Sequence, residues 1–357
     1  MGSLRRHSGE LNRGFMEKID ILSLTGDELT SEICVMGEKA FRAKQIYDWL
    51  HVKKVTDFSQ MSNLSAQFRE VLSRKFYIKS LKIKKRLVSR IDNTVKYLYG
   101  LSDGEAVESV LMEYKHGNSL CISTQVGCKM GCRFCASTIA GWVRNLEPSE
   151  MLLQIYESER DSGRRVDSVV LMGIGEPLDN FDNVVKFLRI LNSDGNGMSL
   201  RHLSLSTCGV VDKIYKLAEL KLGVTLSISL HAATDEKRSA IMPINNRFDL
   251  VKLMKACDDY FAATGRRISF EYSLIEGVND TDESADELIK LLGGKNCHVN
   301  LIPINEIKER EFRKSRYVER FQKKLLSAGI NATVRRTLGA DINAACGQLR
   351  RDDRSDN

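Results

Sequence analysis

Short apolar runs alternate with longer amphipathic segments from residue 120 onward. The runs are rich in Val, Ile and Leu, which is typical of strands buried on both faces. They lie at 120–123, 168–172, 202–206, 224–230, 268–274, 299–302 and 333–335. The amphipathic segments predict helices that begin near Pro148, Asp182, Val211, Asp235, Phe248, Asp282 and Tyr317. This alternation predicts an α/β fold over residues 117–350. The number of units favours an incomplete (βα)6 barrel over a closed barrel of eight.

The segment 16–78 has apolar positions at helical spacing and predicts a small helical accessory domain. Phe41 and Trp49 belong to one predicted helix, and Phe68 belongs to another. Asn63 and Ser65 are plausible caps for the second helix. The lysines and arginines of this domain make it a candidate for RNA binding. It could equally cover an edge of the main domain.

Between residues 79 and 116 the period of the apolar positions changes to two. This predicts an antiparallel β-hairpin layer that links the helical domain to the barrel, with strands at 82–84, 95–99 and 107–112. Turns are expected at Asp92-Asn93 and Asp103-Gly104. Residues 1–15 are expected to form a flexible extension, and residues 351–357 a charged tail.

The composition is that of a folded, soluble protein. Apolar residues make up 42% of the 357 positions and charged residues 28%. No apolar run approaches the roughly 20 residues that a membrane span needs, and the N-terminus lacks the apolar core of a signal peptide. We therefore expect a cytoplasmic protein. Nine cysteines in such a chain indicate metal or redox chemistry rather than a disulfide scaffold.

The formal net charge of +7 favours an anionic partner. The positive charges gather in three places. These are Lys79, Lys82, Lys84, Lys85, Arg86 and Arg90; Lys308, Arg310, Arg313, Lys314 and Arg316; and Arg335, Arg336, Arg350, Arg351 and Arg354. Any one such cluster can be an ordinary solvated face. Three clusters in one basic protein favour nucleic acid as the partner.

Four of the nine cysteines lie between residues 121 and 135. Cys128, Cys132 and Cys135 form a C-x3-C-x2-C run. Three thiolates can hold a metal centre and leave one coordination position open. A zinc knuckle completed by Cys121 or a distant residue is the structural alternative, but such sites more often use paired C-x2-C halves. A [4Fe–4S] cluster with an open iron fits the spacing better.

The other unusual sequences fall where predicted strands end. The segment GIGEP at 173–177 follows the second strand, STCG at 206–209 the third, and SLH at 229–231 the fourth. Asn305 follows the sixth strand, and Cys346 lies beyond the last. In parallel α/β folds, functional residues gather at this edge of the sheet. Each of these residues, taken alone, could equally be a turn or a cap.

The cysteine run, with Phe134 before the last cysteine, resembles the signature of the radical S-adenosylmethionine superfamily. The resemblance implies that the open iron binds the amino and carboxylate groups of S-adenosylmethionine, and that the reduced cluster cleaves it to a radical. It also implies cofactor contacts at particular positions. These are Gly175, Glu176, Ser206, Ser229, Leu230, His231 and Asn305.

A narrower resemblance covers about residues 37–350. The motifs CISTQVGC, CRFCAST, RNL, MGIGEP, SLHA, MPIN, GVND, HVNLIP and AACGQLR are similar to those of the RlmN/Cfr family of RNA adenine methyltransferases. HVNLIPIN, FEYSLIEGVND and Val126 are more similar to the RlmN branch than to the Cfr branch. The implied reaction is methylation of adenine carbon 2. The implied substrates are 23S rRNA, at the peptidyl-transferase centre, and tRNA, at the adenine 3′ of the anticodon.

The resemblance also implies roles for three residues outside the cluster motif. Cys346 would take a methyl group from one S-adenosylmethionine and carry it to the adenine, while a second molecule supplies the radical. Cys121 would release the product by forming a disulfide with Cys346, and Glu108 would accept a proton. By position alone, the two cysteines could be buried apolar residues and Glu108 the polar face of a strand. The expected partners include an electron donor of the flavodoxin or ferredoxin type, and the expected state is a monomer.

Two positions depart from the family pattern. Cys208 stands where serine is common, and Asn343 stands where an acidic residue is usual, with Asp341 nearby. Two other functions stay open. One is Cfr-like methylation of carbon 8 of the same rRNA adenine. The other is a non-catalytic RNA-binding module stabilised by zinc.

Overall fold

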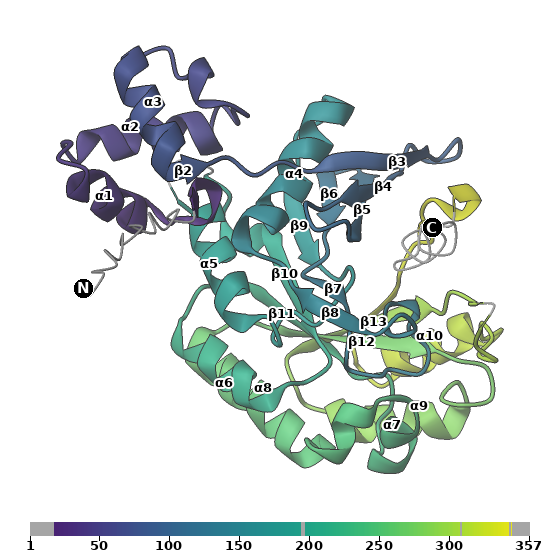
Figure 1. Cartoon of the computed structure of the whole chain (residues 1–357). Coiled ribbons are helices and arrows are strands. Elements are labelled where there is room, and N and C mark those ends of the chain that lie inside the picture. Colours follow the sequence, from purple (N-terminus) through teal and green to yellow (C-terminus); the bar gives the residue numbers. More distant parts are fainter. Residues whose placement is uncertain (1–17, 194–196, 308, 343, 345–357) are drawn as a thin grey trace, which may run out of the picture.

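One ten-stranded sheet runs through the protein (Figure 1). The computed structural model describes residues 18–193, 197–307, 309–342 and 344. The strand order is β14-β13-β12-β11-β10-β9-β6-β5-β4-β3. The parallel strands are β6 (Gly117–Cys121), β9 (Ser168–Leu171), β10 (Leu203–Thr207), β11 (Thr225–Ser229), β12 (Ile268–Leu274), β13 (Cys297–Pro303) and β14 (Ala332–Val334).

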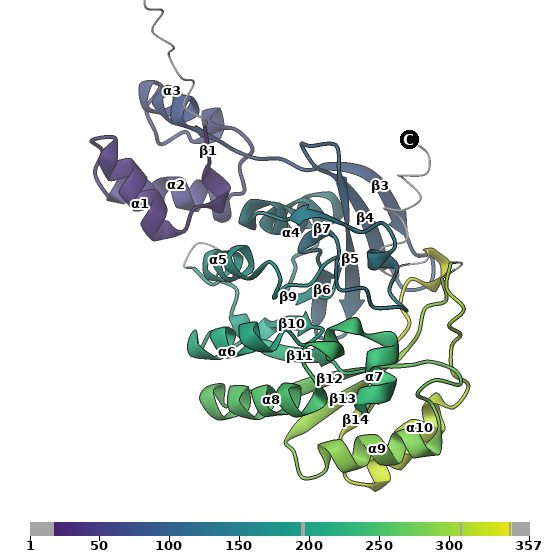
Figure 2. The same ribbon diagram turned by 60° about the horizontal axis from the view of Figure 1, so that its bottom comes forward.

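Helices cover the outer face of these parallel strands (Figure 2). They are α4 (Pro148–Ser162), α5 (Phe181–Leu191), α6 (Val211–Glu219), α7 (Asp235–Ile241), α8 (Leu250–Thr264), α9 (Asp282–Leu292) and α10 (Val318–Ser327). Both α7 and α8 fall between β11 and β12, so six strand–helix units precede the last strand β14. The predicted incomplete (βα)6 barrel is therefore confirmed.

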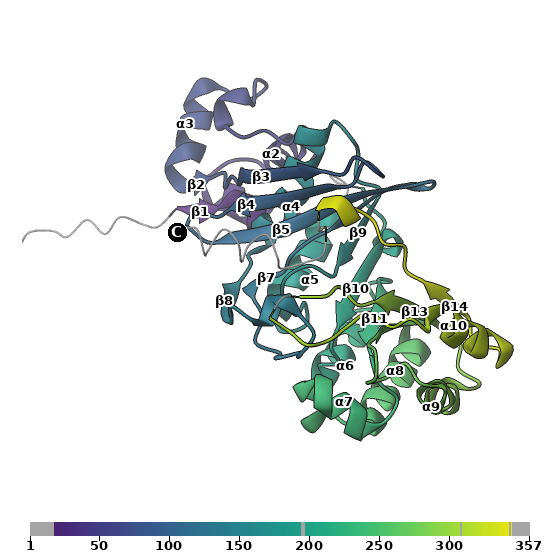
Figure 3. The ribbon, with the colours of Figure 1, turned by 90° about the vertical axis from the view of Figure 1, so that its right-hand side faces the viewer.

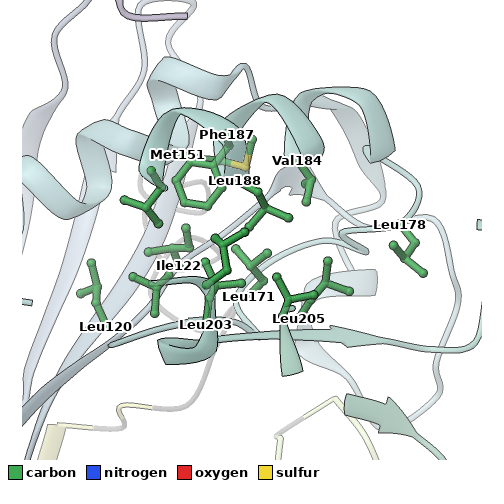
Figure 4. Close-up of a cluster of buried hydrophobic side chains, with 14 of the residues drawn as sticks. Leu120, Ile122, Met151, Leu171, Leu178, Val184, Phe187, Leu188, Leu203 and Leu205 are labelled. Carbon is green, nitrogen blue, oxygen red and sulfur yellow. The ribbon is translucent and has the colours of Figure 1, made fainter. Parts of the chain in front are cut away.

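The core lies between the sheet and the outer helices (Figure 4). Met151 of α4 and Phe187 of α5 pack with Leu120 and Leu171, and all four side chains are almost wholly buried. Burial of large apolar side chains is the main term that stabilises such a layer. Since successive residues of a strand point to opposite faces, the residues next to these, such as Cys121, face the barrel interior.

The N-terminal segment folds into a small helical unit that packs beside α4 and α5 (Figure 1). Its elements are β1 (Ile19–Asp20), α1 (Gly26–Val35), α2 (Phe41–His51), α3 (Ala66–Lys75) and β2 (Phe76–Tyr77). Ser65 caps α3, as expected, by accepting a hydrogen bond from the N–H of Phe68 at 3.2 Å. Helix α1 was not expected. Only Leu29 and Ile33 are buried in it, and its clearest signal is the capping box of Thr25 and Glu28.

The antiparallel strands extend the barrel sheet and do not form a layer of their own. They are β3 (Lys82–Val88), β4 (Val95–Gly100) and β5 (Ala106–Tyr114), and β5 pairs with β6. The expected turns are present, with Asn93 and Gly104 in the left-handed region. A further hairpin, β7 (Gln125–Gly127) with β8 (Trp142–Asn145), was not expected. Among the described residues, no helix is both long and apolar enough to span a bilayer.

His51 joins the helical unit to α4. Its Nδ1 lies 2.9 Å from the Tyr156 hydroxyl, and its side chain is 1% exposed. Burial lowers the pKa of His51 from 6.5 to about 3. The folded protein therefore keeps this ring neutral at pH values where the unfolded chain protonates it, so the stabilising effect is complete above pH 6.5 and is lost as the pH falls.

Between pH 7.5 and pH 5.5, this histidine alone should lower the free energy of unfolding by about 1.4 kcal/mol. Urea denaturation at the two pH values measures the change. The variant His51→Gln cannot titrate in this range, so its stability should fall by that much less than that of the wild type. An identical pH dependence in both proteins would show that His51 does not stay neutral.

Candidate functional site

The cysteine run lies in a loop that begins after β7, and the β7–β8 hairpin closes the base of the loop. The N–H of Cys128 donates to the carbonyl of Gly141 at 3.1 Å. Gly127 has a φ of +78°, and a Cβ there would lie 1.9 Å from that same carbonyl oxygen. Glycine is therefore required at position 127, because any side chain would push the two strands apart.

The three cysteines of the run line one cavity of about 220 Å³ at the C-terminal ends of the parallel strands. Cys128 and Cys132 are buried, and Cys135 is half-buried. Desolvation raises the pKa of Cys128 to about 12 and also raises that of Cys132. Their electrostatic interaction with Cys135 acts in the same direction.

The chemistry of these donors fits a metal cluster. Buried thiols stay protonated unless a positive centre compensates the thiolate charge, and a bound metal supplies that charge. Within the described ranges, no three His, Cys, Asp or Glu side chains are already grouped as they would be around an ion. The three thiols nevertheless share one cavity wall.

The segment after β9 forms a narrow cradle beside the cysteines. Gly175 has a φ of +107°, and a Cβ there would lie 2.8 Å from the backbone nitrogen of Gln125. The carboxylate of Glu176 accepts hydrogen bonds from the N–H groups of Leu178 (3.0 Å) and Cys208 (2.8 Å). Burial raises the pKa of Glu176, and these hydrogen bonds oppose the rise. Glu176 thus ties the end of β9 to the end of β10 while it lines the cavity.

Ser206, Ser229 and His231 line the same cavity. His231 adopts a φ of +57°, and its Nδ1 accepts a hydrogen bond from the N–H of Ser273 at 2.9 Å. Burial lowers its pKa to about 3, so the ring is neutral and carries its proton on Nε2. The ring of Phe134 packs edge-on against it, with centroids 4.8 Å apart.

Two of the predicted cofactor contacts lie elsewhere. Leu230 is fully buried in the hydrophobic core and is absent from the cavity wall. Asn305 lines a second cavity, together with Cys121 and Ala344. The two cavities share Phe134 and Cys135, among other residues, so they lie side by side.

The C-terminal segment crosses back over the antiparallel strands (Figure 3). Its residues Leu338 and Ala344 line the second cavity. The N–H of Gly339 donates to Asp92 at 2.8 Å, and Asp341 accepts from the N–H of Arg90 at 2.8 Å. Both bonds tie the segment to the turn between β3 and β4. The predicted methyl carrier Cys346 and the unusual Asn343 lie outside the described residues.

Glu108 lies in the middle of β5 and is 2% exposed. Its Oε2 is 3.0 Å from the Nζ of Lys96 on β4, and its backbone carbonyl accepts a hydrogen bond from the Ser123 hydroxyl at 2.6 Å. The residues that follow it on the same face, Val110 and Met112, line the cavity that holds Cys121.

Arg238 is a fully buried residue of the site that was not predicted. Its guanidinium donates hydrogen bonds to the carbonyls of Cys208 (2.8 Å), Ser229 (3.1 Å) and Leu230 (3.1 Å). It therefore holds the ends of β10 and β11 together behind the cavity wall. The signal in the sequence that could have identified Arg238 as a site residue is its position between the SLHA and MPIN motifs.

Known proteins match the chain over nearly its full length. A family model described as the ribosomal RNA large subunit methyltransferase N-terminal domain matches residues 19–78. The radical SAM superfamily model matches residues 122–292. A radical SAM methyltransferase structure from Sphaerobacter thermophilus has a TM-score of 0.88 and 38% identity, covering 92% of this chain and 98% of that one. Fold and site together define a radical SAM methyltransferase.

Curated relatives show which family of radical SAM methyltransferases the chain belongs to. A probable dual-specificity RNA methyltransferase RlmN from Lachnoclostridium phytofermentans is 54% identical, over 94% of this chain and 95% of that protein. A relative of the same name from Clostridium perfringens is 53% identical, over 93% and 96%. The chain belongs to the RlmN family, as its motifs predicted.

Proposed function

We propose that this protein methylates carbon 2 of adenine in two RNA substrates, 23S rRNA and tRNA. The observation that carries the proposal is that two cavities lie side by side. One is lined by Cys128, Cys132 and Cys135, and the other by Cys121. A cofactor in the first would thus lie next to a base in the second. The name of the relatives, a dual-specificity RNA methyltransferase, supports two RNA substrates.

The residues of the first cavity would hold the cofactors. Cys128, Cys132 and Cys135 would bind a [4Fe–4S] cluster, and Gly175 and Glu176 would border S-adenosylmethionine. When bound, the pair supplies the methyl group and the radical chemistry that an electron-poor aromatic carbon requires. Ser206, Ser229 and His231 line the same cavity and can donate or accept hydrogen bonds. Leu230 would act through packing, and Asn305 would face the neighbouring cavity.

Three residues would handle the methyl group and the product. Cys346 would carry the methyl group as a thioether, since a thiolate is a good nucleophile toward a sulfonium methyl. Glu108 would accept the proton from the target carbon. Cys121 would attack the sulfur of Cys346 and break the bond between that sulfur and the methylene carbon on the adenine. The electron pair of this bond would stay with the methylene carbon, which takes up a proton to become the methyl group, and the disulfide left between Cys121 and Cys346 must be reopened by a reductant. The disulfide stays a prediction, because Cys346 lies outside the described residues.

The exposed basic strand β3 supports RNA as the partner. Lys82, Lys84, Lys85 and Arg86 are exposed along this edge of the sheet, next to the helical accessory domain proposed for residues 16–78. Such residues contact phosphates without regard to sequence. The target base would have to leave its stack to reach the cavity. A monomer, an electron donor of the flavodoxin or ferredoxin type and a cytoplasmic location complete the proposal.

The reaction product tests the proposal. The reconstituted enzyme is incubated with 23S rRNA fragments and tRNA, and the digested RNA is compared by mass spectrometry with C2- and C8-methyladenosine standards. We expect C2-methyladenosine from both RNAs. A product methylated only on carbon 8 would place the protein with Cfr in activity. A colourless protein that binds zinc and methylates neither RNA would be the RNA-binding module.

A further inference from the structure

A buried ion pair lies on the face of the sheet that carries the second cavity. Lys96 of β4 and Glu108 of β5 are 1% and 2% exposed, and Nζ and Oε2 lie 3.0 Å apart. In the antiparallel register Lys96 is opposite Val110, and Val110 is opposite Cys121. Directly opposed residues of a sheet share a face, so Lys96, Glu108 and Cys121 all face the same way.

Because both charges are buried, the pair is expected to add little to the net stability of the fold. Removing two charges from water costs several kcal/mol per ion, and a well-packed apolar pair is often as stable. The neighbours on this face, Leu98 and Ala106, are apolar, so an apolar pair in place of Lys96 and Glu108 could pack against them. A buried Lys–Glu pair on the face that lines a reactive cavity is therefore a candidate for a role in the chemistry.

We propose that Lys96 is a positioning residue for proton transfer, whose ammonium group holds the carboxylate of Glu108 in place to accept the proton of the target carbon. This inference rests on the proposed function. In the transfer, the C–H bond of the target carbon breaks, its electron pair stays with the adenine–methylene unit, and the proton passes to the carboxylate. Lys96 remains an ammonium throughout, so the pair changes from neutral to a single positive charge.

The Lys96 ammonium lies within ion-pair distance of Glu108, and other titratable groups lie on the elements around the pair. Cys121 is the titratable side chain of β6 on this face, and Lys85 of β3 is exposed to solvent. Strand β7 packs next to β5, and Arg144 of its partner β8 is already bound to Glu150 and Asp103. Arg335 and Arg336 also line the cavity.

The variant Lys96→Met tests the role. At pH 7 we expect kcat to fall by about 10-fold to 100-fold with the KM for RNA unchanged, since a misplaced carboxylate loses part of the roughly 10²- to 10⁴-fold that a general base contributes. Lys96→Arg keeps the charge and should keep kcat within about threefold of the wild type.

Lys237→Met is the matched control, because it removes a lysine from a half-buried pair with Glu287, far from the cavity. It should leave both kcat and the KM for RNA unchanged. A Lys96→Met enzyme with the kcat of the wild type, or a Lys96→Arg enzyme as impaired as Lys96→Met, would overturn the inference. Failure of the wild type to methylate RNA would instead refute the proposed function.

Discussion

Replacing Cys346 by alanine is expected to abolish methyl transfer to RNA, with a loss of more than about a thousandfold. Alanine has no nucleophile to carry the methyl group, and electron-poor adenine carbon cannot take it directly from a sulfonium. The iron content should not change, because Cys128, Cys132 and Cys135 remain. Single-turnover assays with methyl-labelled S-adenosylmethionine measure the transfer, and iron analysis of the same sample measures the cluster.

Cys257→Ala provides the control for removing a cysteine. Cys257 is buried in α8, away from both cavities. This variant should still load label onto the protein and methylate RNA. Measurable RNA methylation by Cys346→Ala would show that the methyl group travels by another route, and the role given to Cys346 would be wrong.

Replacing Cys132 by alanine should remove the cluster. The residue is buried at the centre of the run, and three thiolates are the fewest that hold a [4Fe–4S] cluster with one open iron. Iron and sulfide per chain should fall to near zero after anaerobic reconstitution, and the brown colour should be lost. Methylation of RNA should fall below detection, because no radical can form.

Cys34→Ser serves as the comparison, since Cys34 is an exposed cysteine of α1. It should bind iron and sulfide as the wild type does. A zinc site would give a different result, namely about one zinc per chain and no sulfide in the wild type. Iron retained by Cys132→Ala at the wild-type level would exclude Cys132 as a ligand.

The pattern of apolar residues was sufficient to predict the barrel. Several parallel strands are short runs rich in Val, Ile or Leu, as in β9 (SVVL), and several outer helices have one apolar stripe, as in α5 with Val184 and Phe187. The β7–β8 hairpin escaped prediction because its strands are three and four residues long, too short to show a period. Helix α1 escaped because it buries only two apolar side chains.

The chemistry of the site was also readable in part. Functional motifs lie at strand ends, and parallel strands bring those ends to one edge, so the cysteine run and Glu176 could be placed together in advance. The places of Leu230 and Asn305 could not be predicted in this way. Whether such a residue lines the cavity, enters the core or lines the neighbouring cavity depends on the direction of its side chain. That direction is hard to predict just beyond the end of a strand, because the regular alternation stops there.

The sequence by itself thus determined the donor groups, the strand–helix alternation and the family, because each is carried by residues close together in the chain. Only the tertiary structure decided which distant groups meet. Lys96 faces Glu108 through the antiparallel register of β4 and β5. Asp92 and Arg90 hold the returning segment at Gly339 and Asp341, about 250 residues later. Such pairs depend on the register between strands and on the path of the chain, which no local periodicity encodes.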